Sequence, residues 1–110
     1  MGFTTRQVGD VVVVGVEDQL IVGTRQQLKQ KILDELGDGG LKFVIDFSET
    51  GYIDSSGLGL LVTLSKKISE AGGSLRLAAL NQDLMSLFEL TKLDTLLAIF
   101  DSVEHAIDGF

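Results

Sequence analysis

Residues 54–57, Asp-Ser-Ser-Gly, place one carboxylate and two hydroxyls directly before a long apolar run. The first amide groups of a helix lack partners within the helix, and Asp and Ser side chains are the preferred acceptors for them. The plainest interpretation is a capped helix that begins near Gly57. A serine there can also carry a phosphate, because the free amides and the helix dipole stabilise an added charge of about −1.5 to −2. The motif therefore predicts a cap and, as a sharper hypothesis, a phosphorylation switch.

Catalysis by these residues is disfavoured. A serine hydrolase needs a base beside its nucleophile, but the single histidine, His105, lies in a polar C-terminal segment, and the motif is not G-x-S-x-G. Asp46 and Asp54 are both expected near the C-terminal end of one strand, where α/β sheets often place sites, yet nothing nearby completes an acid–base pair or a metal shell. With no cysteine and one histidine, a zinc site made of protein ligands is disfavoured, and we expect no metal and no cofactor.

The elements that position this motif follow from hydrophobic periodicity and from cap residues. A valine-rich run over residues 11–16 is typical of a buried strand, and a Gly9-Asp10 turn pairs it with residues 3–8. Strands separated by helices indicate an α/β fold, with a mixed, mostly parallel β-sheet of about four to five strands, helices packed on it and an N-terminal β-hairpin. The expected strands are 3–8, 11–16, 42–47, 74–80 and 96–100, and the expected helices are 24–37, 57–70, 81–90 and 102–107, with Thr24, Asn81 and Ser102 as N-caps.

Composition restricts the partners. The formal charge of −7 repels phosphate backbones and anionic lipid, so direct nucleic-acid binding is disfavoured. That charge serves either solubility or steering toward a basic partner. The sequence has no apolar run of the roughly 20 residues that span a bilayer and no signal-peptide pattern at its start, so we expect a soluble, cytoplasmic protein. No proline or linker interrupts residues 1–110, which predicts one domain.

Residues 44–80, VIDFSETGYIDSSGLGLLVTLSKKISEAGGSLRLAAL, resemble the STAS family of bacterial anti-sigma factor antagonists. That family shows an apolar strand ending in Asp, an Asp-Ser-Ser/Thr-Gly-Leu-Gly turn, a helix, Gly-Gly and another strand. Residues 88–96, FELTKLDTL, are similar to its C-terminal segment. The resemblance covers nearly the whole chain, although it is weak before residue 24. Residues 1–110 are therefore identified as a single STAS domain.

The resemblance implies a STAS-type fold and a binding module rather than an enzyme. Such proteins, when unphosphorylated, bind an anti-sigma factor that is also a GHKL-type serine kinase, and thereby free a sigma factor. Phosphorylation of the first serine of the motif, Ser55 here, ends this binding, and a PP2C-type phosphatase restores it. By the same resemblance Asp54 holds the turn, while Ser56 is an N-cap or a secondary hydroxyl. The alternative is an unphosphorylated STAS scaffold in a bacterial signalling complex.

One departure from the family concerns the loop before the first helix. The family usually shows Gly-x-Leu-Asp there, and the aligned residues of this chain place Asp18 at the Gly position and Ile21 at the Asp position. Since that loop lies in the family's partner-binding region, the departure affects the identity of the partner more than the fold. Asp18 is a possible spatial substitute for the missing acidic residue.

The expected docking surface centres on the start of the helix after the motif. It comprises Ser55, Ser56, Gly57 and Leu58 together with the loop from Asp18 to Gly23. Gly57 and Gly59 are expected to let neighbouring backbone approach closely, because glycine has no Cβ. The helix carries more apolar residues than one buried stripe needs, so either some are exposed for a partner or the helix is buried all round.

Overall fold

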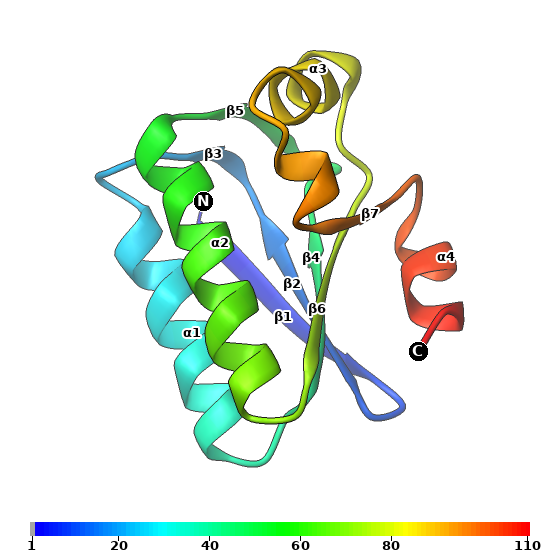
Figure 1. Cartoon of the computed structure of the whole chain (residues 1–110). Coiled ribbons are helices and arrows are strands. Elements are labelled where there is room, and N and C mark those ends of the chain that lie inside the picture. The colour runs from blue at the N-terminus through cyan, green and yellow to red at the C-terminus, as the bar shows by residue number, and fades with distance from the viewer. Residues whose placement is uncertain (1) are drawn as a thin grey trace.

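The computed structural model describes residues 2–110 as a mixed α/β fold. Within these residues the main sheet has five strands in the order β1-β2-β4-β6-β7 (Figure 1). β1 runs antiparallel to β2, and the other neighbouring pairs are parallel. The strands are β1 (Phe3–Val8), β2 (Val11–Val16), β4 (Lys42–Asp46), β6 (Ser74–Ala78) and β7 (Ala98–Phe100). The predicted mostly parallel sheet and its N-terminal hairpin are confirmed.

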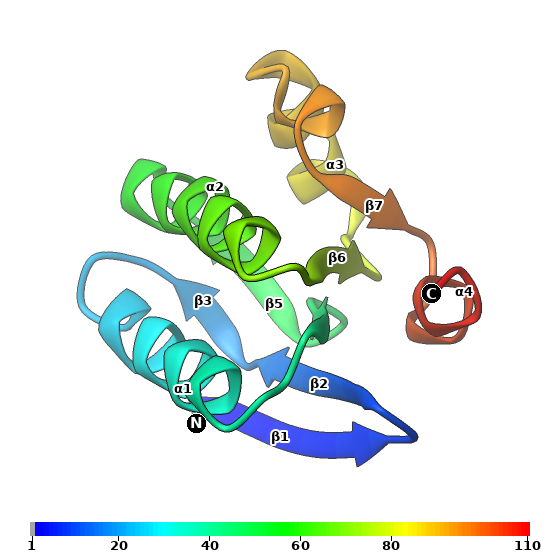
Figure 2. The same ribbon diagram turned by 60° about the horizontal axis from the view of Figure 1, so that its bottom comes forward.

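Helices cover both faces of this sheet. α1 and α2 lie side by side on one face, and α4 lies on the other (Figure 2). α3 and the short 3-10 helix η1 follow β6 and lead into the edge strand β7 (Figure 1). The helices are α1 (Arg25–Gly37), α2 (Ser55–Glu70), α3 (Gln82–Leu90), η1 (Leu93–Thr95) and α4 (Val103–Asp108).

The valine run of β2 is explained by these two layers. Val12 and Val14 belong to the core under α1 and α2, whereas Val11 and Val13 belong to the core under α4. Each of the four is at most 3% exposed. A strand covered on both faces reads as a continuous apolar run instead of an alternating one, which is the pattern that the sequence shows.

The helix boundaries differ from the predicted ones by small amounts. α2 begins at Ser55 instead of near Gly57, because Asp54 and not a serine is its N-cap. Thr24 stands at the N-cap position of α1, but its hydroxyl accepts from the Ile21 amide and holds the preceding loop instead of the helix. The predicted caps of α3 and α4 are confirmed, because the Asn81 side chain accepts from the Leu84 amide and the Ser102 hydroxyl accepts from the His105 amide.

A second, two-stranded parallel sheet was not predicted. It pairs β3 (Asp18–Leu20) with β5 (Thr50–Ile53) at the edge of the molecule where α2 begins. The prediction that Asp46 and Asp54 share one strand is therefore wrong, since Asp46 ends β4 and Asp54 follows β5. The chain turns between β4 and β5, where the Asp46 carboxylate accepts from the Ser48 amide at 2.9 Å and closes a local turn.

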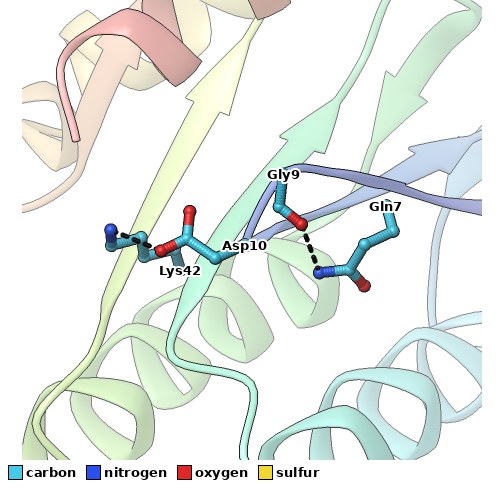
Figure 3. Close-up of polar contacts among 4 residues, drawn as sticks. All are labelled: Gln7, Gly9, Asp10 and Lys42. Carbon is cyan, nitrogen blue, oxygen red and sulfur yellow. Dashed lines mark hydrogen bonds and ion pairs between the residues drawn. The ribbon is translucent and has the colours of Figure 1, made fainter.

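The turn of the β1–β2 hairpin lies at the opposite end of the sheet from the start of α2 (Figure 1). Gly9 has a φ of 61°, as a two-residue hairpin loop requires, and the Gln7 side-chain amide donates to its carbonyl at 3.2 Å. Lys42 at the start of β4 pairs with the Asp10 carboxylate at 2.7 Å (Figure 3).

Candidate functional site

The Asp54 carboxylate connects two segments that are far apart in the sequence. Its Oδ1 accepts from the Gly57 amide at 2.9 Å and from the Ser56 hydroxyl at 2.6 Å. Its Oδ2 accepts from the Val22 amide at 3.1 Å. The Asp54 amide in turn donates to the Leu20 carbonyl at 3.1 Å. The start of α2 and the loop after β3 are therefore held together by one side chain.

These donors also affect the acidity of Asp54. The hydrogen bond from the Ser56 hydroxyl is the first cause that holds the pKa of the Asp54 carboxyl below its ordinary value of 3.8. The amides of Gly57 and Val22 act in the same direction, because each hydrogen bond favours the charged form that accepts it. Asp54 is thus a carboxylate at neutral pH and a fixed part of the turn.

The two serines of the motif are in different situations. Ser55 is the first residue of α2, it is exposed, and within residues 2–110 its hydroxyl makes no hydrogen bond. Ser56 is half-buried and donates to Asp54. The sequence left Ser56 open as an N-cap or a secondary hydroxyl, and the structure gives it neither the cap position nor a free hydroxyl. Ser55 is therefore the accessible hydroxyl of the pair.

Gly57 is required by the close approach of β3. A Cβ on this residue would lie 2.5 Å from the Leu20 carbonyl oxygen and 2.9 Å from Cγ2 of Ile53. Gly59, in contrast, has nothing within 4 Å of the corresponding position. The prediction of a close approach is confirmed for Gly57 and is wrong for Gly59 within the described chain.

The loop between β3 and α1 contributes unevenly to the site. Leu20 and Val22 contact the motif directly, whereas Asp18 lies at the other end of β3, where it pairs with Thr50. Asp18 has a φ of 67°, the left-handed conformation that glycine adopts most readily, so the backbone at this position would also suit the glycine that the family pattern led us to expect. Gly23 is exposed and has nothing within 4 Å of a built Cβ.

The apolar side chains of α2 are mostly internal. Leu58, predicted as a docking residue, is 9% exposed and belongs to the core, so it supports the turn from within. The exposed apolar side chains beside the motif are instead Val22 and Tyr52, at 69% and 57% exposure. Val22 lies within the predicted docking loop of residues 18–23. Sequence reasoning missed Tyr52, because no pattern around it distinguishes an exposed apolar residue from a core residue.

Thr50 is a further supporting residue that the sequence did not indicate. It is 3% exposed, and its hydroxyl donates to the Val16 carbonyl at 2.6 Å. The Asn81 side chain donates to the Thr50 carbonyl at 3.3 Å. The strand that leads into the motif is therefore fixed to both β2 and the start of α3.

The single histidine and the acidic side chains are placed as follows in the described part of the chain. His105 belongs to α4 and contacts Asp101. α4 lies far from the start of α2 (Figure 1). Residues 2–110 hold no group of three or more His, Cys, Asp or Glu side chains able to bind a metal ion. None of the helices in that range is both long enough and apolar enough to cross a membrane.

Comparison with known proteins identifies the family. A model described as the STAS domain matches residues 3–106. The chain belongs to the STAS domain family. The anti-sigma-B factor antagonist of Bacillus subtilis is 31% identical over 94 residues, which cover 86% of this chain and 85% of that protein. The resemblance stated from the sequence is confirmed at the level of family and fold.

Solved structures agree with this STAS assignment. The crystal structure of a Thermotoga maritima protein assigned as an anti-sigma factor antagonist superposes with a TM-score of 0.91 at 30% identity, covering 97% of this chain and 92% of that one. The unphosphorylated anti-sigma factor antagonist SpoIIAA gives a TM-score of 0.76 at 22% identity, covering 97% of this chain and 96% of that one. Its phosphorylated form from Bacillus has the same TM-score. The SpoIIAA structures show the shared fold.

Proposed function

We propose that this STAS domain is an anti-sigma factor antagonist whose binding is switched by phosphorylation of Ser55. The observation that carries the proposal is the contrast between the two serines. Ser55 is exposed and its hydroxyl has no hydrogen bond within residues 2–110, whereas the Ser56 hydroxyl is held by Asp54. A kinase needs a hydroxyl that it can reach and rotate toward the transferred phosphoryl group, and Ser55 meets both requirements.

Family membership and the similar anti-sigma factor antagonists support the class of partner in this proposal. In the proposal the unphosphorylated chain binds an anti-sigma factor that is also a GHKL-type serine kinase, and so releases a sigma factor in the cytoplasm. A PP2C-type phosphatase removes the phosphate again. The chain acts as a binding module and as the substrate of these enzymes, without activity of its own. That SpoIIAA is known in an unphosphorylated and a phosphorylated form supports the switch.

Electrostatics explains how a phosphate at Ser55 would end binding. The phosphate adds about −1.5 to −2 charges directly beside the Asp54 carboxylate, at the free amides of the α2 N-terminus. The exposed apolar side chains of Val22 and Tyr52 lie on neighbouring segments. A partner that covers them must also cover the new charge, which costs desolvation free energy.

The first test is phosphate transfer with a matched pair of variants. Wild type, Ser55→Ala and Ser56→Ala are incubated with ATP and a GHKL-type kinase from the same genome, and phosphate is counted by intact mass. We expect one added phosphate on wild type and on Ser56→Ala, and none on Ser55→Ala. Transfer to Ser55→Ala but not to Ser56→Ala would contradict the assignment.

The second test is binding of the same kinase by isothermal titration calorimetry. Ser55→Ala should bind as wild type does and keep its affinity in the presence of ATP. Ser55→Asp should bind at least about tenfold more weakly, because it places a permanent charge at the helix start. Equal affinities of the two variants would exclude the switch, and binding without phosphate transfer would support the scaffold alternative.

A further inference from the structure

Gly59 is a glycine that its own chain does not require. It lies inside α2 and is exposed, its φ is not in the left-handed region, and a Cβ there would meet nothing within 4 Å. Glycine in a helix interior is destabilising relative to alanine because of its backbone entropy. Gly57, two residues earlier, is explained by the Leu20 carbonyl, but Gly59 has no such neighbour. The absent side chain therefore leaves open space on the outer face of α2, which no atom of residues 2–110 fills.

Gly59 shares one helix face with the candidate phosphorylation site. Residues 55, 59, 62 and 66 are spaced four, three and four apart, which places them in one row along a helix of 3.6 residues per turn. Ser55, Gly59 and Lys66 are exposed and Val62 is half-buried. We call this row the α2 strip (Ser55, Gly59, Val62 and Lys66). It begins at the serine and runs along the whole first three turns.

A pocket lies at the far end of the α2 strip. It has a volume of about 370 Å³ and is formed by Val62, Ser65 and Lys66 of α2 with Leu96 and Leu97, which follow η1. Leu96 is 65% exposed although it is a large apolar residue. The lining of the pocket includes one cation, Lys66, and no carboxylate. The pocket therefore suits an apolar side chain with an acidic neighbour.

We propose that the α2 strip is a second part of the surface that the anti-sigma factor covers. The partner presents a segment whose backbone crosses α2 closely at Gly59, with an apolar side chain in the pocket between Val62 and Leu96 and a carboxylate near Lys66. Because the α2 strip is continuous with Ser55, the segment belongs to the same partner as the switch. The charge of α2 also favours an acidic segment: between Ser55 and Lys67 the helix bears two lysines and no acidic residue, whereas the net charge of the chain is −7. The identity of the partner rests on the proposed function.

A methyl group added at Gly59 tests the close crossing. Gly59→Ala and the control Gly37→Ala each place a methyl in open space on an exposed helix position, so both variants should melt at or above the wild-type temperature. In calorimetric titration with the anti-sigma factor, Gly59→Ala should bind about tenfold more weakly, since a tightly packed interface does not accommodate an extra methyl. Gly59→Gln should lose at least about a hundredfold. Gly37→Ala should bind as wild type.

The charge of the pocket is tested by Lys66→Glu against Lys31→Glu, an exposed lysine of α1. Lys66→Glu should weaken binding about tenfold at low salt and less at high salt, and Lys31→Glu should have a smaller effect. If Gly59→Gln binds as wild type while Ser55→Asp does not, the α2 strip is overturned and the proposed function stands. If wild type itself does not bind the anti-sigma factor, the proposed function is excluded, and so is the anti-sigma factor as the partner of the α2 strip.

Discussion

Two carboxylates lie at opposite ends of the sheet, Asp54 at the start of α2 and Asp10 in the β1–β2 turn, and the pKa of each is held below its ordinary value of 3.8. The causes differ. Asp54 accepts hydrogen bonds from a hydroxyl and from two backbone amides that belong to two segments. Asp10 is stabilised by the side chain of Lys42, with which it hydrogen-bonds and pairs in charge (Figure 3).

The difference shows which of the two ends is built into the fold. The amides that bind Asp54 are fixed by α2 and by the loop after β3, so the carboxylate and the backbone position each other. The side chains of Lys42 and Asp10 are 40% and 73% exposed, and such surface ion pairs contribute little because water and salt screen them. A lowered pKa alone therefore does not distinguish an organising residue from a surface one, whereas the origin of the donors does.

The largest effect is expected from crowding the start of α2. Gly57→Val should lower the free energy of unfolding by about 3 kcal/mol, because the new side chain meets the Leu20 carbonyl at 2.5 Å and backbone cannot move aside cheaply. Urea denaturation measures this change. The control at the other end of the sheet is Gly9→Asn. Asparagine tolerates the φ of 61° that Gly9 has, and its Cβ would meet nothing within 4 Å.

The Gly57 prediction compares the two ends through their glycines. Gly9→Asn should cost less than about 1 kcal/mol, as expected for a residue that visits the left-handed region readily. If Gly57→Val and Gly9→Asn had equal effects, the close packing of β3 on α2 would not be the reason for Gly57.

A smaller effect is expected from removing each carboxylate. Asp54→Ala should lower the melting temperature by about 4–8 °C, because it removes the N-cap and leaves the Val22 amide without its partner. Asp10→Ala should lower it by less than about 2 °C, as expected for one exposed ion pair. Differential scanning calorimetry measures both.

Asp54→Asn serves as the matched variant, since an asparagine oxygen can still accept from the Gly57 amide without a charge. It should recover most of the melting temperature that Asp54→Ala loses. A larger loss for Asp10→Ala than for Asp54→Ala would reverse the comparison between the two ends.

The sequence predicted most of the parts of this arrangement separately. Period and cap residues placed the main sheet, its hairpin and the helices, and the motif located the start of α2 within two residues. What it did not predict is the sheet of β3 and β5, because strands of three and four residues without an alternating pattern give no local signal. The contact between Val22 and Asp54 spans 32 residues and depends on that sheet.

The distinction between the two glycines of the motif was also beyond the sequence. Gly57 and Gly59 lie two residues apart and each precedes a leucine, and only the packing of Leu20 and Ile53 against Gly57 separates a required glycine from an unexplained one. In the same way the family's loop pattern located residues 18–21, but it did not show that Leu20 is the one that bonds to Asp54 and packs on Gly57. Exposure and long-range packing decide both questions, and neither is encoded in local periodicity.

The smallest effect is the pH dependence of stability, which separates the two carboxylates by their response to salt. The pKa of Asp54 is lower in the folded chain than in the unfolded one, so the unfolded chain binds a proton at a higher pH. The stabilisation by Asp54 is complete above 3.8 and is lost as the pH falls below that value, toward the lowered pKa of the folded state. The same sign applies to Asp10.

Urea denaturation at pH 7 and at about pH 3 measures this loss as the difference between wild type and each Asp→Asn variant, since the asparagine does not titrate. At low ionic strength both Asp54→Asn and Asp10→Asn should reduce the pH dependence. At about 1 M salt, where the Debye length is about 3 Å, the Asp10 contribution should shrink because its partner Lys42 is a charged group in an exposed ion pair. The Asp54 contribution should persist, since its donors are neutral groups in direct contact, and its disappearance at high salt would mean that Asp54 too is held by screened charge instead of by the fold.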